Sequence, residues 1–231
     1  MRKLLVALAV LAVLLLVADR ASAALASRAL ADELQRSGGL SARPTVDVGG
    51  FPFLTQAVGG RYDRIEVRAE DVPAGEVRLA GLEAVLNGVQ VPLGDALSGS
   101  VAAVPVDRVD ARVRLAYDVL ARRSGGRRLS VAPAGARVRV TGSVEVLGQT
   151  VSATALSRVA LDGDVVVVTA ESFEVGNGVA NAVLSRALGD RFDLRVPVRG
   201  LPYGLRVEQV SVEPDGVVVT AAAVDAVLTR P

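Results

Sequence analysis

Apolar and polar residues alternate along most of the chain after Pro44. The alternation recurs in residues 61–69, 76–79, 109–115, 136–140, 151–161 and 205–208. Successive side chains of a half-buried strand point to opposite faces, so this period of two predicts roughly ten strands in a sheet with one face in water. Hairpin-turn residues separate adjacent runs at Asp162-Gly163-Asp164 and at Glu213-Pro214-Asp215-Gly216. We therefore expect neighbouring strands to be antiparallel.

Three segments have helical spacing instead. Residues 25–36 keep Ala and Leu on one side before a Gly38-Gly39 stop, and a short helix is expected over residues 117–123. The longest segment, residues 177–191, aligns five apolar side chains, those of Val179, Val183, Leu184, Ala187 and Leu188. Such a stripe packs against a core, and it also lines a ligand cavity if the sheet curls around the helix incompletely.

The chain begins with a basic and apolar leader. Arg2 and Lys3 precede an unbroken apolar run over residues 4–18, which Asp19-Arg20 and the small residues 21–24 follow. This order fits a secretory signal peptide over residues 1–23, cleaved at an A-x-A-like site. It equally fits an uncleaved anchor with its basic end held inside. Under both interpretations, the rest of the chain is exported to the cell envelope or periplasmic space. Under the second, residues 4–18 anchor it to the cytoplasmic membrane.

We expect an amphipathic helix over residues 24–39 and a single β-rich domain over residues 40–231, of α+β class. An uncleaved leader would continue into that helix and lift the domain off the bilayer. Basic residues are scattered, and acidic residues nearly balance them. Because this lacks the clustered basic stripe that binds phosphates, we expect no nucleic-acid partner.

Missing residue types limit the chemistry. The sequence has no His and no Cys, and its one Lys is Lys3 in the leader. A serine nucleophile needs a base such as His or Lys, and transition metals favour imidazole and thiolate ligands. We therefore expect no cofactor, no metal and no enzymatic activity. Carboxylates remain, as the close pairs Glu70-Asp71, Asp162/Asp164 and Glu213/Asp215, so a carboxylate-dependent glycan hydrolase stays an alternative.

The densest local motif is a corner around one proline. Residues 46–56 hold Gly49-Gly50 and then Phe51, Pro52, Phe53 and Leu54, with two of the four Phe in the whole chain. Such an apolar corner is either buried as part of the core or exposed as a wedge that contacts a lipid chain or a membrane surface. A membrane-tethered scaffold with an exposed apolar patch for a protein partner is a further alternative.

This corner, with Gly60–Val67 and Leu82–Val89, resembles the actinobacterial LmeA-type family, which is associated with phospholipid binding and cell-envelope mannan maturation. The resemblance spans most of the exported region. It implies a fold similar to tubular lipid-binding (TULIP-like) proteins, in which a curved antiparallel sheet wraps a helix around an apolar cavity for acyl chains.

The sequence thus predicts an exported protein that binds phospholipid acyl chains and contacts the membrane surface. Lipid transfer and support of lipoglycan maturation are the roles considered. Burying lipid methylenes, at roughly 0.8 kcal/mol each, provides affinity without a catalytic group. The candidate lipid-binding residues are Phe51, Phe53, Leu54, Val183, Leu184 and Leu188. The headgroup, the arginines that contact it and the oligomeric state are left open.

Overall fold

The computed structural model describes residues 2–74, 77–122, 129–146, 149–163, 165–175, 178–179, 194–197 and 202–229. Its helices are α1 (Arg2–Ser37), α2 (Phe53–Gly59), α3 (Leu93–Ser98) and α4 (Tyr117–Arg122), with a 3₁₀ turn, η1, at Pro202–Gly204. The strands are β1 (Thr45–Gly49), β2 (Arg61–Ala74), β3 (Val77–Gln90), β4 (Ala103–Leu115), β5 (Ser130–Ala134), β6 (Arg137–Val146), β7 (Gln149–Asp162), β8 (Val165–Val175), β9 (Gly178–Val179), β10 (Leu194–Pro197), β11 (Arg206–Glu213) and β12 (Gly216–Thr229).

The strands form two open sheets. One has the order β1-β2-β3-β4-β12-β11 and the other β10-β8-β7-β6-β5, with β9 paired to β8. The pairs β1–β2, β11–β12, β5–β6, β6–β7, β7–β8, β8–β10 and β8–β9 are antiparallel. The predicted hairpin at residues 213–216 pairs Glu213 with Gly216, and β7 and β8 flank the predicted turn at residues 162–164. The prediction of a mostly antiparallel α+β fold is confirmed.

The chain divides into two compact units. Unit 1 comprises residues 1–72, 83–111 and 223–231, and unit 2 comprises residues 73–82 and 112–222. The single β-rich domain expected over residues 40–231 stays a prediction. The helix predicted over residues 177–191 is wrong at Gly178 and Val179, which pair with β8 as strand β9. The rest of that segment lies outside the described residues.

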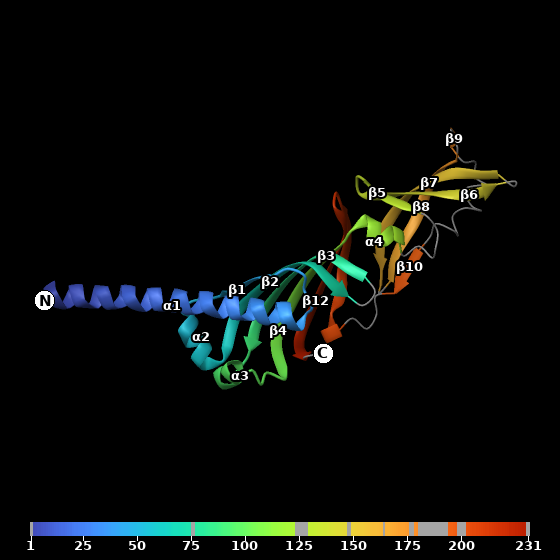
Figure 1. Cartoon of the computed structure of the whole chain (residues 1–231). Coiled ribbons are helices and arrows are strands. Elements are labelled where there is room, and N and C mark those ends of the chain that lie inside the picture. Colours follow the sequence, from blue (N-terminus) through green and yellow to red (C-terminus); the bar gives the residue numbers. More distant parts are fainter. Residues whose placement is uncertain are drawn as a thin grey trace. The chain divides into compact units, whose positions relative to one another are not determined.

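In unit 1, α1 is one continuous helix. The leader and the amphipathic segment expected over residues 24–39 both belong to it, and it ends at the predicted glycine stop. There the Gly38 amide donates to the Leu34 carbonyl at 2.9 Å, the Leu40 amide donates to the Gln35 carbonyl at 3.1 Å, and Gly39 takes a φ of +59°. This is the geometry that glycine favours beyond a helix end. The N-terminal half of α1 extends away from the rest of unit 1 (Figure 1).

Small and aliphatic side chains build both cores. The core of unit 1 collects residues from α1, α2 and the strands: Ala23, Ala31, Val48, Phe53, Ala57, Ile65, Ala69, Val89, Val106, Val109, Ala223 and Ala226. In unit 2 the central cluster comprises Val138, Val140, Ala153, Ala155, Phe173 and Val217. The short predicted helix at residues 117–123 is present as α4, and its Tyr117 and Leu120 pack against this cluster.

Candidate functional site

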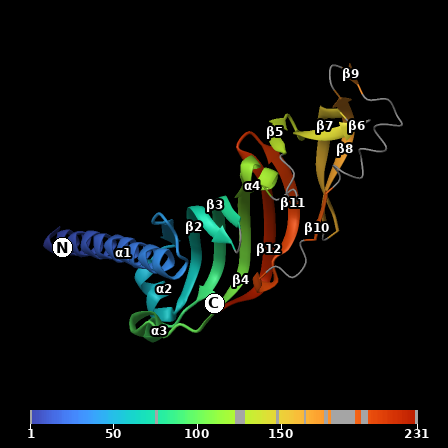
Figure 2. The same cartoon turned by 45° about the vertical axis from the view of Figure 1, so that its right-hand side comes forward.

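The predicted corner contains a short helix. Gly50 takes a φ of +92°, the Phe51–Pro52 peptide bond is cis, and α2 runs from Phe53 to Gly59 before Gly60 closes it at a φ of +66°. This positive φ favours glycine at position 50, and a side chain there would also displace the Gln56 amide, since its Cβ would lie 2.4 Å from Gln56 Nε2. Figure 2 shows α2 and α3 next to each other at one end of strands β2 to β4.

Asp19 of α1 caps this helix from a distance in sequence. Residues 2–18 of α1 are all exposed, and Asp19 is the first buried residue, at 3% exposure. Its Oδ1 accepts a hydrogen bond from the Leu54 backbone amide at 2.8 Å. Pro52, the residue before α2, makes no side-chain capping bond. Because the first amides of a helix lack partners within it, the carboxylate of α1 supplies the acceptor that the local sequence lacks.

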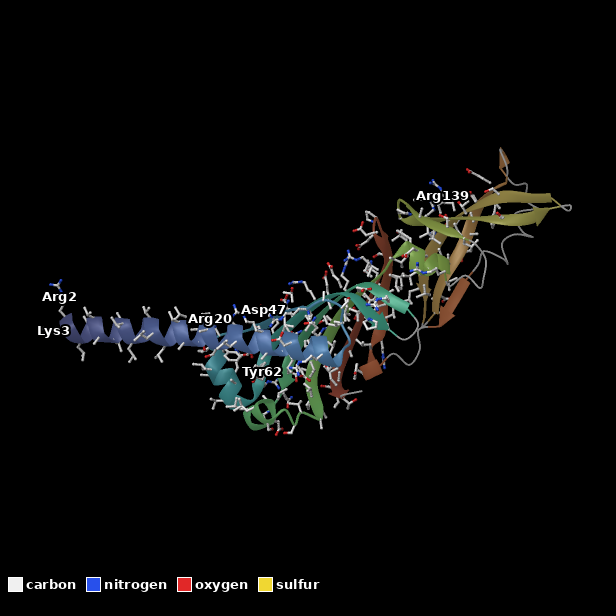
Figure 3. The ribbon with its side chains drawn as sticks, in the orientation of Figure 1. Arg2, Lys3, Arg20, Asp47, Tyr62 and Arg139 are labelled. Carbon is white, nitrogen blue, oxygen red and sulfur yellow. The ribbon has the colours of Figure 1, made fainter. Side chains whose placement is uncertain are left out.

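Arg20 adds two further contacts to the same corner. Its Nη2 pairs with Asp19 at 2.7 Å and also donates to the Gly50 carbonyl at 3.2 Å. Its guanidinium carbon lies 4.9 Å from the centroid of the Phe51 ring, within cation–π range. Figure 3 shows Arg20 on α1, well along the helix from Arg2 and Lys3. Asp19 and Arg20 therefore fasten the corner to the end of the apolar run.

The two aromatic rings of the corner have opposite environments. Phe53 is 5% exposed, and its ring centroid lies 6.1 Å from that of Tyr62 on β2. Burial also raises the pKa of the Tyr62 phenol. Phe51 is 64% exposed, and Leu54 is 39% exposed. The sequence offered a buried corner or an exposed wedge; the structure places Phe53 in the core and Phe51 and Leu54 at the surface.

Exposed apolar side chains continue along α2 and onto α3. Val58 is 78% exposed, and Leu93 and Leu97 of α3 are exposed as well. Sequence reasoning missed Val58, Leu93 and Leu97, and also Asp19 and Arg20, which it treated only as the flank of the leader. The signal available was the charged pair that ends the apolar run, but its partner lies 35 positions away.

The other predicted lipid-binding residues, Val183, Leu184 and Leu188, lie outside the described residues. Their role in lipid binding stays a prediction.

Three described carboxylates of the predicted pairs contact side chains that are distant in the sequence. Glu213 pairs with Arg112, and Asp215 lies 3.8 Å from Arg114. Asp71 accepts a hydrogen bond from Ser41 Oγ at 2.9 Å. Within the described part of the chain, no group of three or more His, Cys, Asp or Glu residues is placed to hold a metal ion.

Arginine–carboxylate networks lie on the surface of each unit. On β2 the Arg64 guanidinium, with Arg68, holds the pKa of Glu66 below its usual value. In unit 2, Glu171 is held between Arg158 on β7 and Arg137 on β6, and both lower its pKa. These pairs fix strand positions at modest gain, since exposed ion pairs contribute little each.

The sheets of unit 2 have a nearly apolar interior. Phe173 on β8 pairs with Ala155 on β7, and Val140 on β6 faces the same Ala155 from the other side. One polar atom interrupts this interior: Ser157 Oγ is buried and has no hydrogen-bond partner among the described residues. Buried hydroxyls usually have a partner, so Ser157 is a departure from the rest of the core.

These features together define a β-rich protein whose leader helix is integral to one folded unit and whose exposed apolar residues gather where that helix ends. By length and composition α1 is able to cross a membrane. The sequence matches the LmeA-like phospholipid-binding family over residues 17–222, and the chain belongs to this family. Searches of curated proteins and of solved structures found no match.

Proposed function

We propose that this chain is an exported cell-envelope protein that binds phospholipid by its acyl chains and that it works at the membrane into which α1 inserts. The family match over residues 17–222 carries the ligand class, because phospholipid binding is the property that defines the family. The match begins inside α1 and includes residues of both units.

The residue chemistry supports acyl chains as the part of the lipid that is bound. The facing strands of unit 2 present Val, Ala and Phe side chains, and the chain lacks His, Cys and any Lys beyond Lys3. Methylene groups need only an apolar surface, and each one buried contributes roughly 0.8 kcal/mol. A non-catalytic role in lipid transfer, or in presenting lipid during lipoglycan maturation, requires no further chemistry from the protein.

Photo-crosslinking tests this proposal. The full chain is reconstituted in phosphatidylcholine vesicles that contain a phospholipid with a photoactivatable acyl chain, and labelled peptides are mapped after irradiation. We expect labels on the strands of unit 2 as well as on α1. Unlabelled phospholipid should compete, whereas the water-soluble headgroup analogue glycerophosphate should not. Labels confined to α1 would contradict acyl-chain binding by the rest of the two units, because only α1 would then contact lipid.

A further inference from the structure

The apolar edge of α2 lies next to the point where α1 changes from uniformly exposed and apolar to partly buried and mixed in polarity. Residues 2–18 are exposed throughout, and burial begins at Asp19. Asp19 binds the Leu54 amide, and Arg20 lies over the Phe51 ring. The position of α2 along α1 is therefore fixed by two adjacent residues at the end of the apolar run.

The length of α1 determines where Asp19 and Arg20 lie relative to the bilayer. At 1.5 Å per residue, the helix rises about 26 Å from Arg2 to Asp19, close to the ~30 Å thickness of a bilayer hydrocarbon core. With Arg2 and Lys3 in one headgroup layer, Asp19 and Arg20 then reach the opposite one. The apolar run itself is short for a span, and a short span draws its flanking residues toward the hydrocarbon.

We propose that an exposed apolar edge, formed by Phe51 just before α2 and by Leu54 and Val58 of α2, docks on the bilayer surface from which α1 emerges. Three observations select a lipid bilayer as the occupant. The edge is continuous with the apolar run of α1 through the Arg20–Phe51 contact. Arg20 remains half exposed beside it, where a guanidinium pairs with lipid phosphate. Aromatic and aliphatic side chains beside a basic residue are typical of membrane-interface segments.

The same contacts require α1 to remain in the mature protein. Cleavage after Ala23 would remove Asp19 and Arg20, and with them the acceptor for the Leu54 amide. It would also cut the helix next to Ala23, which is buried in the core of unit 1. Further along α1, Ser27 Oγ accepts from the Val48 amide at 3.0 Å, and Asp32 pairs with Arg43 at 2.9 Å, so the helix is attached over much of its length.

Intact mass is the first test. The proposal rests on the membrane location proposed above, and it expects the protein isolated from the envelope of producing cells to retain residues 2–23. A mature protein that begins at Ala24 would overturn it. That result would leave phospholipid binding by the folded units standing, because photo-crosslinking measures it separately.

Tryptophan fluorescence tests the docking itself. The chain has no Trp, so a single substitution gives a unique reporter. We compare Val58→Trp and Phe51→Trp with Val224→Trp, which replaces a comparably exposed valine of unit 1 on β12. Each full-length variant is reconstituted in phosphatidylcholine and phosphatidylglycerol vesicles with brominated acyl chains. We expect strong quenching at positions 51 and 58 and little at position 224.

Equal emission at all three positions, with or without bromine, would overturn the docking. So would a reporter at position 58 that is unquenched in vesicles but shielded in native envelopes, since a protein would then be the occupant. Asp19→Ala should reduce the quenching at position 58, because α2 loses its attachment. Asp32→Ala is the matched control: it breaks another α1 contact, the ion pair with Arg43, and should leave quenching unchanged.

Discussion

The carboxylate of Asp19 accepts a hydrogen bond from the backbone amide of Leu54 at 2.8 Å. One end of this bond lies in the leader helix and the other in the first turn of α2. A residue that the sequence presents as the flank of an export signal is thus the N-terminal cap of another helix. The bond makes the position of α2 depend on α1 remaining intact.

Substitutions of Asp19 distinguish the hydrogen bond that it accepts from the negative charge that it carries. Asp19→Ala should lower the urea midpoint of unfolding, because the Leu54 amide loses its acceptor. Asp19→Asn should retain most of the stability, since an amide oxygen still accepts. Asp32→Ala, which breaks only an exposed ion pair, should have a smaller effect than Asp19→Ala. Equal losses for Asp19→Ala and Asp32→Ala would contradict the cap.

The two phenylalanines of the corner should respond in opposite ways. Phe53→Ala should lower the free energy of unfolding by about 3–5 kcal/mol, because it empties a buried site beside Tyr62. Phe51→Ala should cost less than about 1 kcal/mol, since its exposed ring loses only the contact with Arg20. Chemical denaturation followed by circular dichroism measures both. If the two substitutions lower the free energy of unfolding by similar amounts, the contrast between a buried Phe53 and an exposed Phe51 is wrong.

Alanine substitutions at Gly88 and Gly59 should change the stability in opposite directions. Gly88 has a φ of +65°, and a Cβ there would lie 2.0 Å from Asp107 Oδ2, the partner of Arg61. Gly88→Ala should therefore destabilise unit 1 by more than about 1 kcal/mol. Gly59 ends α2, and a Cβ there meets nothing within 4 Å. Gly59→Ala should stabilise by about 0.5–1 kcal/mol. Thermal unfolding of the two variants measures the difference. If both substitutions raise or both lower the unfolding temperature, the prediction is wrong.

Replacing Ser157 by alanine should stabilise the protein. Its buried hydroxyl has no partner among the described residues, and such a group costs about 1–3 kcal/mol when left unsatisfied. Ser157→Ala should therefore raise the free energy of unfolding by about 1 kcal/mol. Ser152→Ala, at an exposed position on the same strand, should leave it unchanged. A loss of stability for Ser157→Ala would mean that the hydroxyl has a partner.

Acid should weaken the Glu171 network. Its pKa is lowered by the hydrogen bond from Arg158 and by Arg137, so the folded state favours the charged carboxylate. This contribution is present above the unfolded-state pKa and is lost as the pH falls through the lower folded-state value. Glu171→Gln should be less stable than the wild type at neutral pH, and the difference should begin to shrink as the pH falls below the ordinary Glu pKa of about 4.3. Urea unfolding across this range measures it; a constant difference would exclude linkage to Glu171.

Local pattern was sufficient for much of the fold. Alternation predicted strands at residues 61–69, 109–115 and 136–140. The first two fall within β2 and β4, and the third overlaps the start of β6 at residues 137–140. It also predicted the hairpin at residues 213–216 and the end of α1 at Gly38-Gly39. Local pattern did not predict α2 or α3, because each is too short to show a helical period.

The sequence by itself determined the classes of structure and chemistry: an apolar leader, antiparallel strands, an apolar interior and the absence of His and Cys. Periodicity reveals which residues share one face of their own element, and that information is local. Only the tertiary structure decided that Asp19 caps α2, and that Phe53 is buried while Phe51 is exposed. Those outcomes depend on which surfaces of distant elements meet, and residues 35 positions apart carry no shared period that would reveal such a contact.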